Sequence, residues 1–457
     1  MSVHHQDPWL TVHVGDCRAV LATMEAESVH TVVTSPPYWG LRDYGTATWE
    51  GGDADCDHKK PNADTGHITH STLGGGKATN AAQVGGYRST CGKCGATRQD
   101  AQLGLEPTPE QYVENMVAVF REVRRVLRSD GTLWLNLGDS YFGTGKGPTA
   151  PTGMHGQNGT PYPTAGVYTH ATLKGKDLVG IPWRVAFALQ ADGWYLRSDI
   201  IWSKPNPMPE SVTDRPTKAH EYLFLLAKSE RYYFDADAVR EPMESGPSDL
   251  RKMTEQRDRI GGLVKEQSDP KLAASALTNV GRKRSVGNPP AGRNIRSVWT
   301  IATQPYPGAH FATFPPKLVE PCILAGTSER GVCPECGAPW RRVVERERAR
   351  EGATPTSRDT KAAGNSAMVS LPAHARTDAS KSGMGTPAVT TTGWRPTCTH
   401  DATPVPATVL DPFGGSGTTA MVAQHLSRRA VLIDLNPDYI DQQLKRNQAM
   451  PLGLEAA

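Results

Sequence analysis

The chain has 457 residues, of which only 37% are hydrophobic, and it contains 45 glycines and 36 prolines. The length alone allows two or three domains, but this composition favours one well-formed core that carries long irregular insertions. Its formal net charge is +3, no apolar run is long enough to cross a membrane and the N-terminus lacks a signal-peptide pattern, so we expect a cytoplasmic protein without a membrane partner.

Strands and helices are predicted to alternate along the chain. The strand candidates are residues 10–14, 30–34, 132–136, 197–202, 222–226, 408–410 and 430–433. The helix candidates are residues 18–26, 109–128, 182–191, 315–325, 418–427 and 437–448. The clearest helix starts at Pro109, because apolar residues recur from Tyr112 to Leu127 at helical spacing. This alternation predicts an α/β fold, with a Rossmann-like, doubly wound, mostly parallel seven-stranded sheet and helices on both faces.

The first notable motif is Ser35-Pro36-Pro37-Tyr38, which directly follows a β-rich segment. Two consecutive prolines cannot continue a strand ladder and hold the backbone rigid, so their carbonyls point outward. The Ser35 hydroxyl can accept a hydrogen bond, and the rings of Tyr38 and Trp39 can stack on a base pulled out of a duplex. The alternative is a Pro-rich turn with a packed tyrosine.

Six of the eight cysteines fall into two matching sets, each with one histidine. The first set is Cys56, His58, Cys91 and Cys94, and the second is Cys333, Cys336, Cys398 and His400. Each set offers four ligands in a Cys-x-x-Cys-Gly plus Cys-x-His pattern, enough for one closed tetrahedral zinc site. The sequence therefore predicts two structural zinc ions; unpaired surface thiols or a redox Cys-x-x-Cys are the alternatives.

Positive charge is concentrated in residues 251–296, which hold eleven Lys or Arg against four Asp or Glu. The densest parts contain the predicted DNA-binding residues Arg282, Lys283, Arg284, Arg293 and Arg296. Phosphate neutralisation requires such clustering, and base reading in the major groove favours arginine. A solvated basic loop is the alternative. Residues 57–88, 143–172 and 345–392 have the composition of loosely folded segments.

A Gly-rich turn follows the strand candidate that ends at Asp411. Its glycines, Gly414, Gly415 and Gly417, let the backbone turn sharply and approach a ligand at the mouth of an α/β sheet. The spacing differs from the dinucleotide-binding G-x-G-x-x-G, and no P-loop lysine is present. The next strand candidate ends at Asp434, where a carboxylate can grip ribose hydroxyls. The alternative is an ordinary Gly-rich turn.

The Ser-Pro-Pro-Tyr motif and the Gly-rich turn together resemble those of the β-class DNA amino-methyltransferases. In that family the catalytic motif precedes the motif for S-adenosyl-L-methionine (AdoMet), a circularly permuted order, and the recognition region lies between them. The resemblance covers most of the chain, although the cysteine-bearing insertions lie outside the minimal family pattern. It implies an AdoMet-dependent enzyme that flips a base out of double-stranded DNA and methylates its exocyclic amine.

The resemblance also implies roles for individual residues. Ser35 and the carbonyl of Pro36 would accept the two amino hydrogens, and Tyr38 would stack on the flipped base. The predicted catalytic residues are Ser35, Pro36, Pro37 and Tyr38. Asp16 resembles the motif near the adenine ring, and the segment from Phe314 resembles the one along the methionine part. The predicted cofactor-binding residues are Asp16, Phe314, Pro315, Lys317, Asp411, Pro412, Phe413, Gly415, Ser416, Gly417, Thr418 and Asp434.

Serine at position 35 favours cytosine N4 as the methylated atom, because Ser-Pro-Pro-Tyr is more often found in the cytosine-N4 members of the family. Adenine N6 is the alternative. An RNA or protein-glutamine methyltransferase and an inactive DNA-binding zinc protein are less favoured. A cognate restriction nuclease is a candidate partner, and the oligomeric state stays open, with a dimer as one option.

The predicted division of the chain follows from these motifs. The core is expected to comprise residues 1–55, 105–240, 301–330 and 403–457. Zinc-knuckle insertions are expected at residues 56–104 and 331–402, and the DNA target-recognition region at residues 241–300.

Overall fold

The structure is a computed structural model of the chain. It describes residues 2–40, 48–53, 55–58, 90–99, 101–142, 170–241, 293–304, 314–346 and 389–448. The chain divides into two compact units, of which the first comprises Met1–Ala238, Arg296–Arg341 and Pro396–Ala457, and the second Val239–Ile295 and Arg342–Arg395. The segments predicted to be loosely folded lie mostly outside the described residues.

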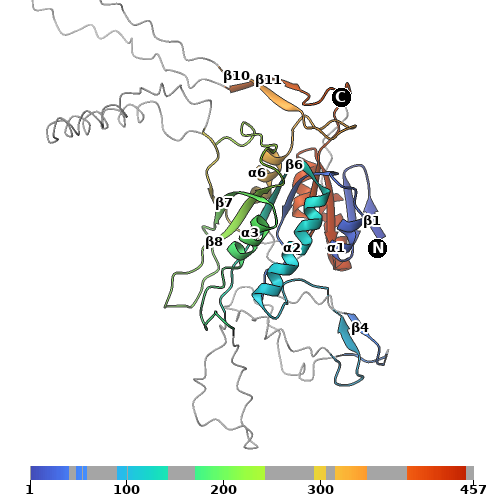
Figure 1. Cartoon of the computed structure of the whole chain (residues 1–457), viewed down its shortest axis with the longest axis vertical. Coiled ribbons are helices and arrows are strands. Elements are labelled where there is room, and N and C mark those ends of the chain that lie inside the picture. Colours follow the sequence, from blue (N-terminus) through green and yellow to red (C-terminus); the bar gives the residue numbers. More distant parts are fainter. Residues whose placement is uncertain are drawn as a thin grey trace, which may run out of the picture. The chain divides into compact units, whose positions relative to one another are not determined.

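A nine-stranded sheet forms the centre of the first unit (Figure 1), in the order β1-β2-β13-β12-β3-β6-β8-β7-β9. Its strands are β1 (Ser2–Gln6), β2 (Leu10–Val14), β3 (Val29–Thr34), β6 (Leu127–Leu137), β7 (Tyr195–Ser203), β8 (His220–Ala227), β9 (Val298–Thr300), β12 (Thr408–Asp411) and β13 (Arg429–Asp434). The five neighbours from β2 to β6 run parallel, whereas β8 runs antiparallel to both β6 and β7.

All seven predicted strands are present in this sheet, but the predicted count of seven is two strands short. The additional strands, β1 and β9, lie at the two edges. β1 is mainly polar and β9 has three residues, so neither carries the apolar pattern by which a strand is recognised from sequence.

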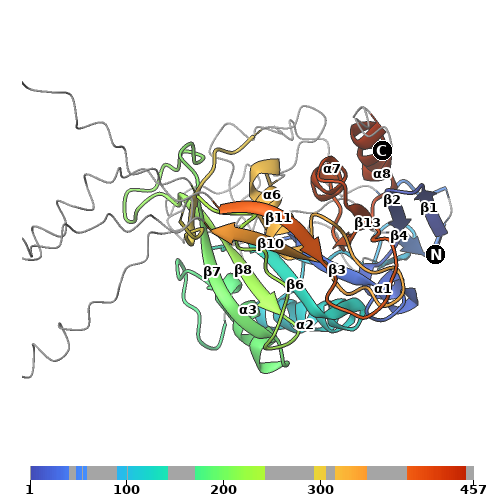
Figure 2. The same cartoon turned by 90° about the horizontal axis from the view of Figure 1, so that it is seen from above.

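Helices cover both faces of the sheet. They are α1 (Cys17–Thr23), α2 (Pro109–Val126), α3 (Ile181–Ala191), α6 (Pro316–Gly326), α7 (Thr418–His425) and α8 (Pro437–Gln448). Helix α2 contacts α1 and α3, and α7 contacts α6 and α8; these two rows lie on opposite faces of the sheet (Figure 2). The fold is therefore the doubly wound α/β arrangement that the alternation of elements predicts.

Helix α2 illustrates why the sequence folds this way. Thr108 caps its start, accepting a hydrogen bond from the backbone nitrogen of Gln111 at 3.2 Å, and Pro109 occupies the first turn. Its apolar stripe, from Tyr112 to Val126, is buried. The helix ends at Val126 rather than Arg128, because Leu127 already belongs to β6.

Two small sheets stand outside the central one. β4 (Thr48–Glu50) pairs antiparallel with β5 (Thr97–Gln99), and β10 (Arg341–Arg346) pairs with β11 (Val389–Arg395). Within the described ranges, no helix combines the length and the apolar character needed to cross a membrane.

Candidate active site and metal centres

The predicted motifs meet at the edge of the sheet where the parallel strands end. Register pairs Leu410 of β12 with Val32 of β3, so Ser35 and Pro412 follow neighbouring strands. On the other side, Asp434 of β13 pairs with Val14 of β2. Ligands of open α/β sheets bind outside the carboxyl ends of the strands, and the motifs lie at such an edge.

One cavity opens at this edge and draws its wall from segments far apart in the sequence. The predicted cofactor-binding residues in the wall are Asp16, Phe314, Pro412, Phe413, Gly415, Ser416, Thr418 and Asp434. The predicted catalytic residues Ser35 and Pro37 line it as well, so the cavity joins the two motifs. Gly15 and Gly414, which belong to the same two cofactor segments, also border it. The lining residues that sequence reasoning missed are Cys17, Ala101, Gln102, Leu103, Leu435, Asn436, Tyr439 and Gln442.

Four predicted cofactor residues do not border the cavity: Pro315, Lys317, Asp411 and Gly417. Lys317 is exposed in the first turn of α6. Gly417 adopts the left-handed conformation (φ +75°) at the start of α7, where its role is to shape the turn. The predicted catalytic residue Pro36 is buried and also lies outside the lining.

Gly414 packs closely against its neighbours in the turn. A Cβ atom at Gly414 would lie 3.0 Å from the Gln443 side-chain nitrogen and 3.2 Å from the Leu432 Cβ. The Gln443 amide donates to the Gly415 carbonyl at 2.8 Å, and Arg446 donates to the Ser416 hydroxyl at 2.9 Å. Side chains of α8 therefore hold the turn in place.

Asp434 is one of the two aspartates in the cavity wall. Its two oxygens accept hydrogen bonds from the backbone nitrogens of Gly415 (2.7 Å) and Asn436 (2.9 Å). Burial, followed by repulsion from Asp411, raises the pKa of Asp434 to about 7, although the backbone donors oppose that shift. The group is thus poised to change its charge near neutral pH.

Asp411 lies beneath the turn rather than in the cavity. Its carboxylate is 1% exposed and accepts hydrogen bonds from the hydroxyls of Thr34 (2.6 Å) and Thr419 (2.7 Å). Burial raises the pKa of Asp411 to about 6. In this position the side chain ties β3 and β12 to α7, and it can affect a ligand through the turn above it.

Asp16 caps the start of α1 and also borders the cavity. It accepts hydrogen bonds from the backbone nitrogens of Arg18 (2.9 Å) and Ala19 (3.2 Å). Burial acts to raise its pKa, but the hydrogen bonds from Arg18 and Ala19 lower the pKa of Asp16 below its usual value. Asp16 therefore stays ionised at neutral pH.

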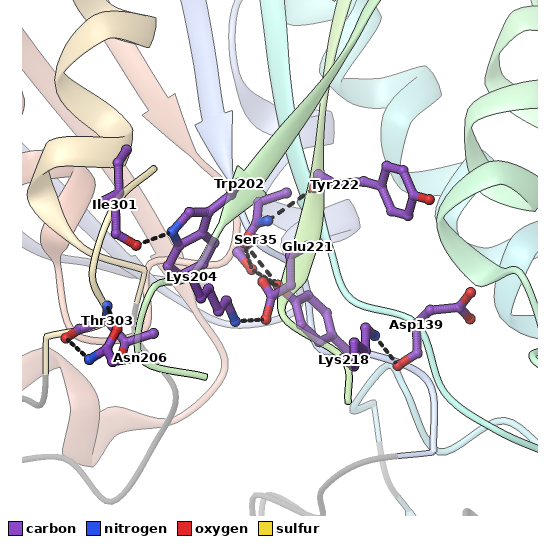
Figure 3. A network of polar contacts seen from close by, with 12 residues as sticks. Ser35, Asp139, Trp202, Lys204, Asn206, Lys218, Glu221, Tyr222, Ile301 and Thr303 are labelled. Carbon is purple, nitrogen blue, oxygen red and sulfur yellow. Dashed lines mark hydrogen bonds and ion pairs between the residues drawn. The ribbon is translucent and has the colours of Figure 1, made fainter. Parts of the chain in front are cut away.

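Ser35 belongs to a cluster of polar side chains beyond the cavity wall (Figure 3). Its hydroxyl lies 3.2 Å from the Tyr38 hydroxyl and 3.3 Å from the side-chain oxygen of Asn136. The Tyr38 hydroxyl is 2.8 Å from this same Asn136 oxygen and 2.8 Å from a Glu221 carboxylate oxygen. Lys204 completes the cluster through an ion pair with the other Glu221 oxygen.

The sheet explains why these side chains meet. Register pairs Thr34 with Leu135, so Ser35 lies beside Asn136 at the end of β6. Glu221 comes from the start of β8, which runs antiparallel to β6 and so begins where β6 ends. Sequence reasoning missed Asn136, Lys204 and Glu221, because none of them belongs to a motif.

The two aromatic rings of the Ser-Pro-Pro-Tyr-Trp segment have different surroundings. The Tyr38 ring edge packs against Gly138, where an added Cβ would lie 2.5 Å from a ring carbon. Burial and then the Glu221 charge raise the pKa of the Tyr38 hydroxyl well above 10. Trp39 is 7% exposed and packs in the core, so the prediction that its ring stacks on a base is wrong.

Both predicted metal-ligand sets assemble. In each set of four, the ligand atoms all lie within 4.8 Å of one another. Cys56 and Cys91 sulfurs are 3.9 Å apart, and the Cys333 sulfur lies 3.6 Å from the His400 Nδ1. A tetrahedral zinc ion with Zn–S bonds of about 2.3 Å separates its sulfur ligands by roughly 3.8 Å, so this spacing fits the ion.

The two Cys-x-x-Cys-Gly turns have the same backbone geometry. Gly95 donates to the Cys91 carbonyl at 2.9 Å, and Gly337 donates to the Cys333 carbonyl at 2.8 Å. Both glycines are left-handed, with φ of +76° and +67°. A hydrogen bond from His58 lowers the pKa of Cys91 to about 6, which favours the thiolate that binds metal.

The predicted DNA-binding residues are only partly visible. Arg282, Lys283 and Arg284 lie outside the described residues. Arg293, in the second unit, pairs with Glu241 at 2.8 Å, and their backbones exchange two hydrogen bonds. Arg296, in the first unit, is exposed.

Comparisons with known proteins agree with this geometry. A family model described as DNA methylase, for N6 and N4 enzymes, matches residues 29–333 and 399–445. The chain is 33% identical to the type II methyltransferase M.Cfr9I of Citrobacter freundii over 438 residues, 96% of this chain and 87% of that protein. It is 32% identical to M.SmaI of Serratia marcescens over 93% of this chain and 86% of that protein.

Among solved structures, the chain is similar to PvuII DNA methyltransferase, described as cytosine-N4-specific, at 13% identity. The similarity covers 99% of this chain and 92% of that chain, with a TM-score of 0.45. A putative DNA modification methylase of Thermus thermophilus in complex with AdoMet has a TM-score of 0.39 and 17% identity, over 95% of this chain and 92% of that one.

Proposed function

Since the chain belongs to the AdoMet-dependent DNA methylases that modify base amino groups, we propose that it transfers a methyl group to N4 of cytosine in double-stranded DNA. The observation that carries this proposal is the position of Ser35. Its side chain borders the same cavity as Asp434 and the Gly-rich turn, so a base amine held at Ser35 would face a cofactor held by the turn.

The target amine is a poor nucleophile because its lone pair is delocalised into the base ring. Ser35 and the carbonyl of Pro36 would accept the two amino hydrogens and turn that lone pair toward the cofactor. The turn that presents them is held rigidly, since the Tyr112 hydroxyl donates to the Pro37 carbonyl at 2.9 Å. Positioning and electrostatics would therefore supply most of the rate enhancement.

The residues that line the cavity support its assignment as the AdoMet site. Asp434 would accept the ribose hydroxyl hydrogens, and Asp16 and Phe314 would border the adenine and methionine parts. When bound there, AdoMet supplies the methyl group as a sulfonium. Asp411 would support the site by holding the turn from beneath.

Cytosine is chosen over adenine on the basis of Ser35. Serine at this position is the form more often found in cytosine-N4 members of the family. A neutral hydroxyl can accept from either amine, so the chemistry alone permits both bases. Residues 241–300 would recognise the target DNA sequence. The partner would be a restriction nuclease of the same specificity, against which methylation protects the DNA.

Two structural zinc ions belong to the same proposal. Each would be held by three thiolates and one imidazole, which leaves no open position for water, so the ions would act in folding rather than in catalysis. The spacing of the ligand atoms and the repeated Cys-x-x-Cys-Gly turn support this assignment.

Expression in a host that lacks DNA methylation tests the proposal. We expect N4-methylcytosine in the nucleosides of the host DNA, and a single modified sequence motif by long-read sequencing. N6-methyladenine without N4-methylcytosine would overturn the choice of base. DNA with no modified base from a well-expressed, AdoMet-binding protein would overturn the methyl transfer itself.

A further inference from the structure

The cluster around Ser35 contains more oxygen contacts than hydrogens to fill them. Four contacts of 2.8–3.3 Å join Ser35, Tyr38, Asn136 and Glu221. The Asn136 amide nitrogen is directed elsewhere, because it donates to the Tyr222 carbonyl at 3.0 Å, so Asn136 presents its oxygen. With Glu221 ionised, the hydroxyls of Ser35 and Tyr38 supply one hydrogen each, so two of the four oxygen–oxygen contacts have no hydrogen between them.

A proton on Glu221 would reduce this deficit. The carboxylic acid would donate to Tyr38, Tyr38 would donate to Asn136, and the Ser35 hydrogen would keep a partner. Glu221 is also the ionisable carboxyl group of the four, and Lys204 forms an ion pair with it at the far side of the cluster. Lys204 itself sits over the Trp202 ring, 4.3 Å from its centroid, which fixes the ammonium in place.

We propose that Glu221 accepts the proton that the target amine releases on methylation, through Ser35 and Tyr38, and that the ion pair with Lys204 holds the Glu221 carboxylate in position. The inference rests on the proposed function. The amine lone pair forms the N–C bond, and the C–S bond breaks with its electron pair on sulfur. The amine proton passes to the Ser35 oxygen, the Ser35 proton to Tyr38, and the Tyr38 proton to Glu221.

The ion pair of Glu221 and Lys204 is largely buried, as expected for a proton acceptor in an active site. Its side chains are 16% exposed for Glu221 and 17% for Lys204, so water competes little for the proton. Lys218, from the segment before β8, also faces Glu221, and its amine donates to the Asp139 carbonyl at 2.7 Å. Tyr38 faces it from the segment after β3, and Asp139 lies beyond Lys218 (Figure 3).

Replacing Glu221 by Gln tests the proposal in the full-length protein with unmethylated DNA. We expect single-turnover methyl transfer to slow by about 100-fold, the scale of a lost general base, with AdoMet affinity unchanged because Glu221 does not line the cavity. The matched control is Glu210→Gln in the loop before β8, where Glu210 pairs with Arg215 outside the cluster. This control should transfer at the wild-type rate.

The double variant Lys204→Met with Glu221→Gln distinguishes a purely structural role of this ion pair from a role in proton transfer. Removing both charges leaves no unpaired buried charge, so thermal stability should return toward wild type. If the pair serves only to hold β7 and β8, the methyl-transfer rate would return as well. We expect the thermal stability of the double variant to return toward wild type while its methyl-transfer rate stays low.

Two further readouts follow from the route. In a Tyr38→Phe background, Glu221→Gln should have no additional effect on the rate, since residues that act in one chain are not additive. Lys204→Met should also slow methyl transfer while leaving AdoMet affinity unchanged, because Glu221 loses the cation that pairs with it and Lys204 does not line the cavity.

A wild-type-like rate for Glu221→Gln, or additive effects with Tyr38→Phe, would overturn the inference alone. A wild-type protein that transfers no methyl group to DNA would instead overturn the proposed function, and this inference with it.

Discussion

Asp411 and Asp434 end neighbouring parallel strands, and both have a raised pKa, yet their surroundings differ. The Asp411 carboxylate accepts hydrogen bonds from two threonine hydroxyls, so its role is structural. Asp434 has backbone donors on one side and the cavity on the other, so it can bind a ligand. Position at a strand end does not by itself decide between the two roles.

The raised pKa of Asp434 predicts a pH-dependent cofactor affinity. Below about pH 7 the group is protonated in the cofactor-free protein and accepts hydroxyl hydrogens poorly. AdoMet affinity should therefore be constant above pH 7 and fall below it, with a limiting slope of about tenfold per pH unit for a single proton. Calorimetric titrations across this range measure the slope.

Asp434→Asn is the control for this dependence. The variant should bind AdoMet weakly, with no change of affinity around pH 7. A wild-type affinity that stays constant from about pH 5.5 to about pH 8 would show that Asp434 does not contact the cofactor.

Among the secondary-structure elements, the apolar pattern predicts the central strands and the six helices of the described residues, because burial on one or both faces dictates that pattern. The edge strands β1 and β9 escape it, since an edge strand needs little apolar surface. The polar cluster escapes for a different reason. The motifs recognisable in the sequence lie at the carboxyl ends of parallel strands, whereas Glu221 lies at the start of the antiparallel β8.

The metal-binding turns are short elements whose geometry the cysteine spacing does predict. We expect purified protein to contain two zinc ions per chain by elemental analysis. Cys91→Ser and Cys333→Ser should each lower this content by about one and destabilise the protein, because a structural zinc site contributes directly to folding.

Cys322→Ala provides the matched cysteine control. Cys322 is buried in α6 and belongs to neither set, so its replacement should leave the zinc content at two. A folded, active protein that retains no zinc after purification would remove both assignments.

At the scale of the whole molecule, positive charge is separated from the catalytic machinery along the sequence. Residues 251–296 carry a net +7, so the rest of the chain sums to −4. A DNA-binding surface assembled from this segment would supply positive charge for phosphate contacts. Its densest part, Arg282 to Arg284, lies outside the described residues.

Replacing Arg282, Lys283 and Arg284 together by Ala should weaken DNA binding and reduce its salt dependence by about 1 to 3 units of log–log slope. AdoMet affinity should stay unchanged. Replacement of Arg348, Arg350 and Lys361, which lie outside the basic segment, controls for the loss of three charges. An unaltered slope in the first triple variant would identify its residues as a solvated loop.

In the proposed reaction, Ser35 presents a DNA base amine to a methyl group held in the adjoining cavity. Methyl-deuterated AdoMet, purified protein and unmethylated DNA test it directly, with nucleosides read by mass spectrometry. We expect deuterated N4-methylcytosine from the wild type, and almost none from a Ser35→Ala variant that still binds AdoMet. A Ser35→Ala variant as active as the wild type, or label on a carbon atom of the base, would contradict it.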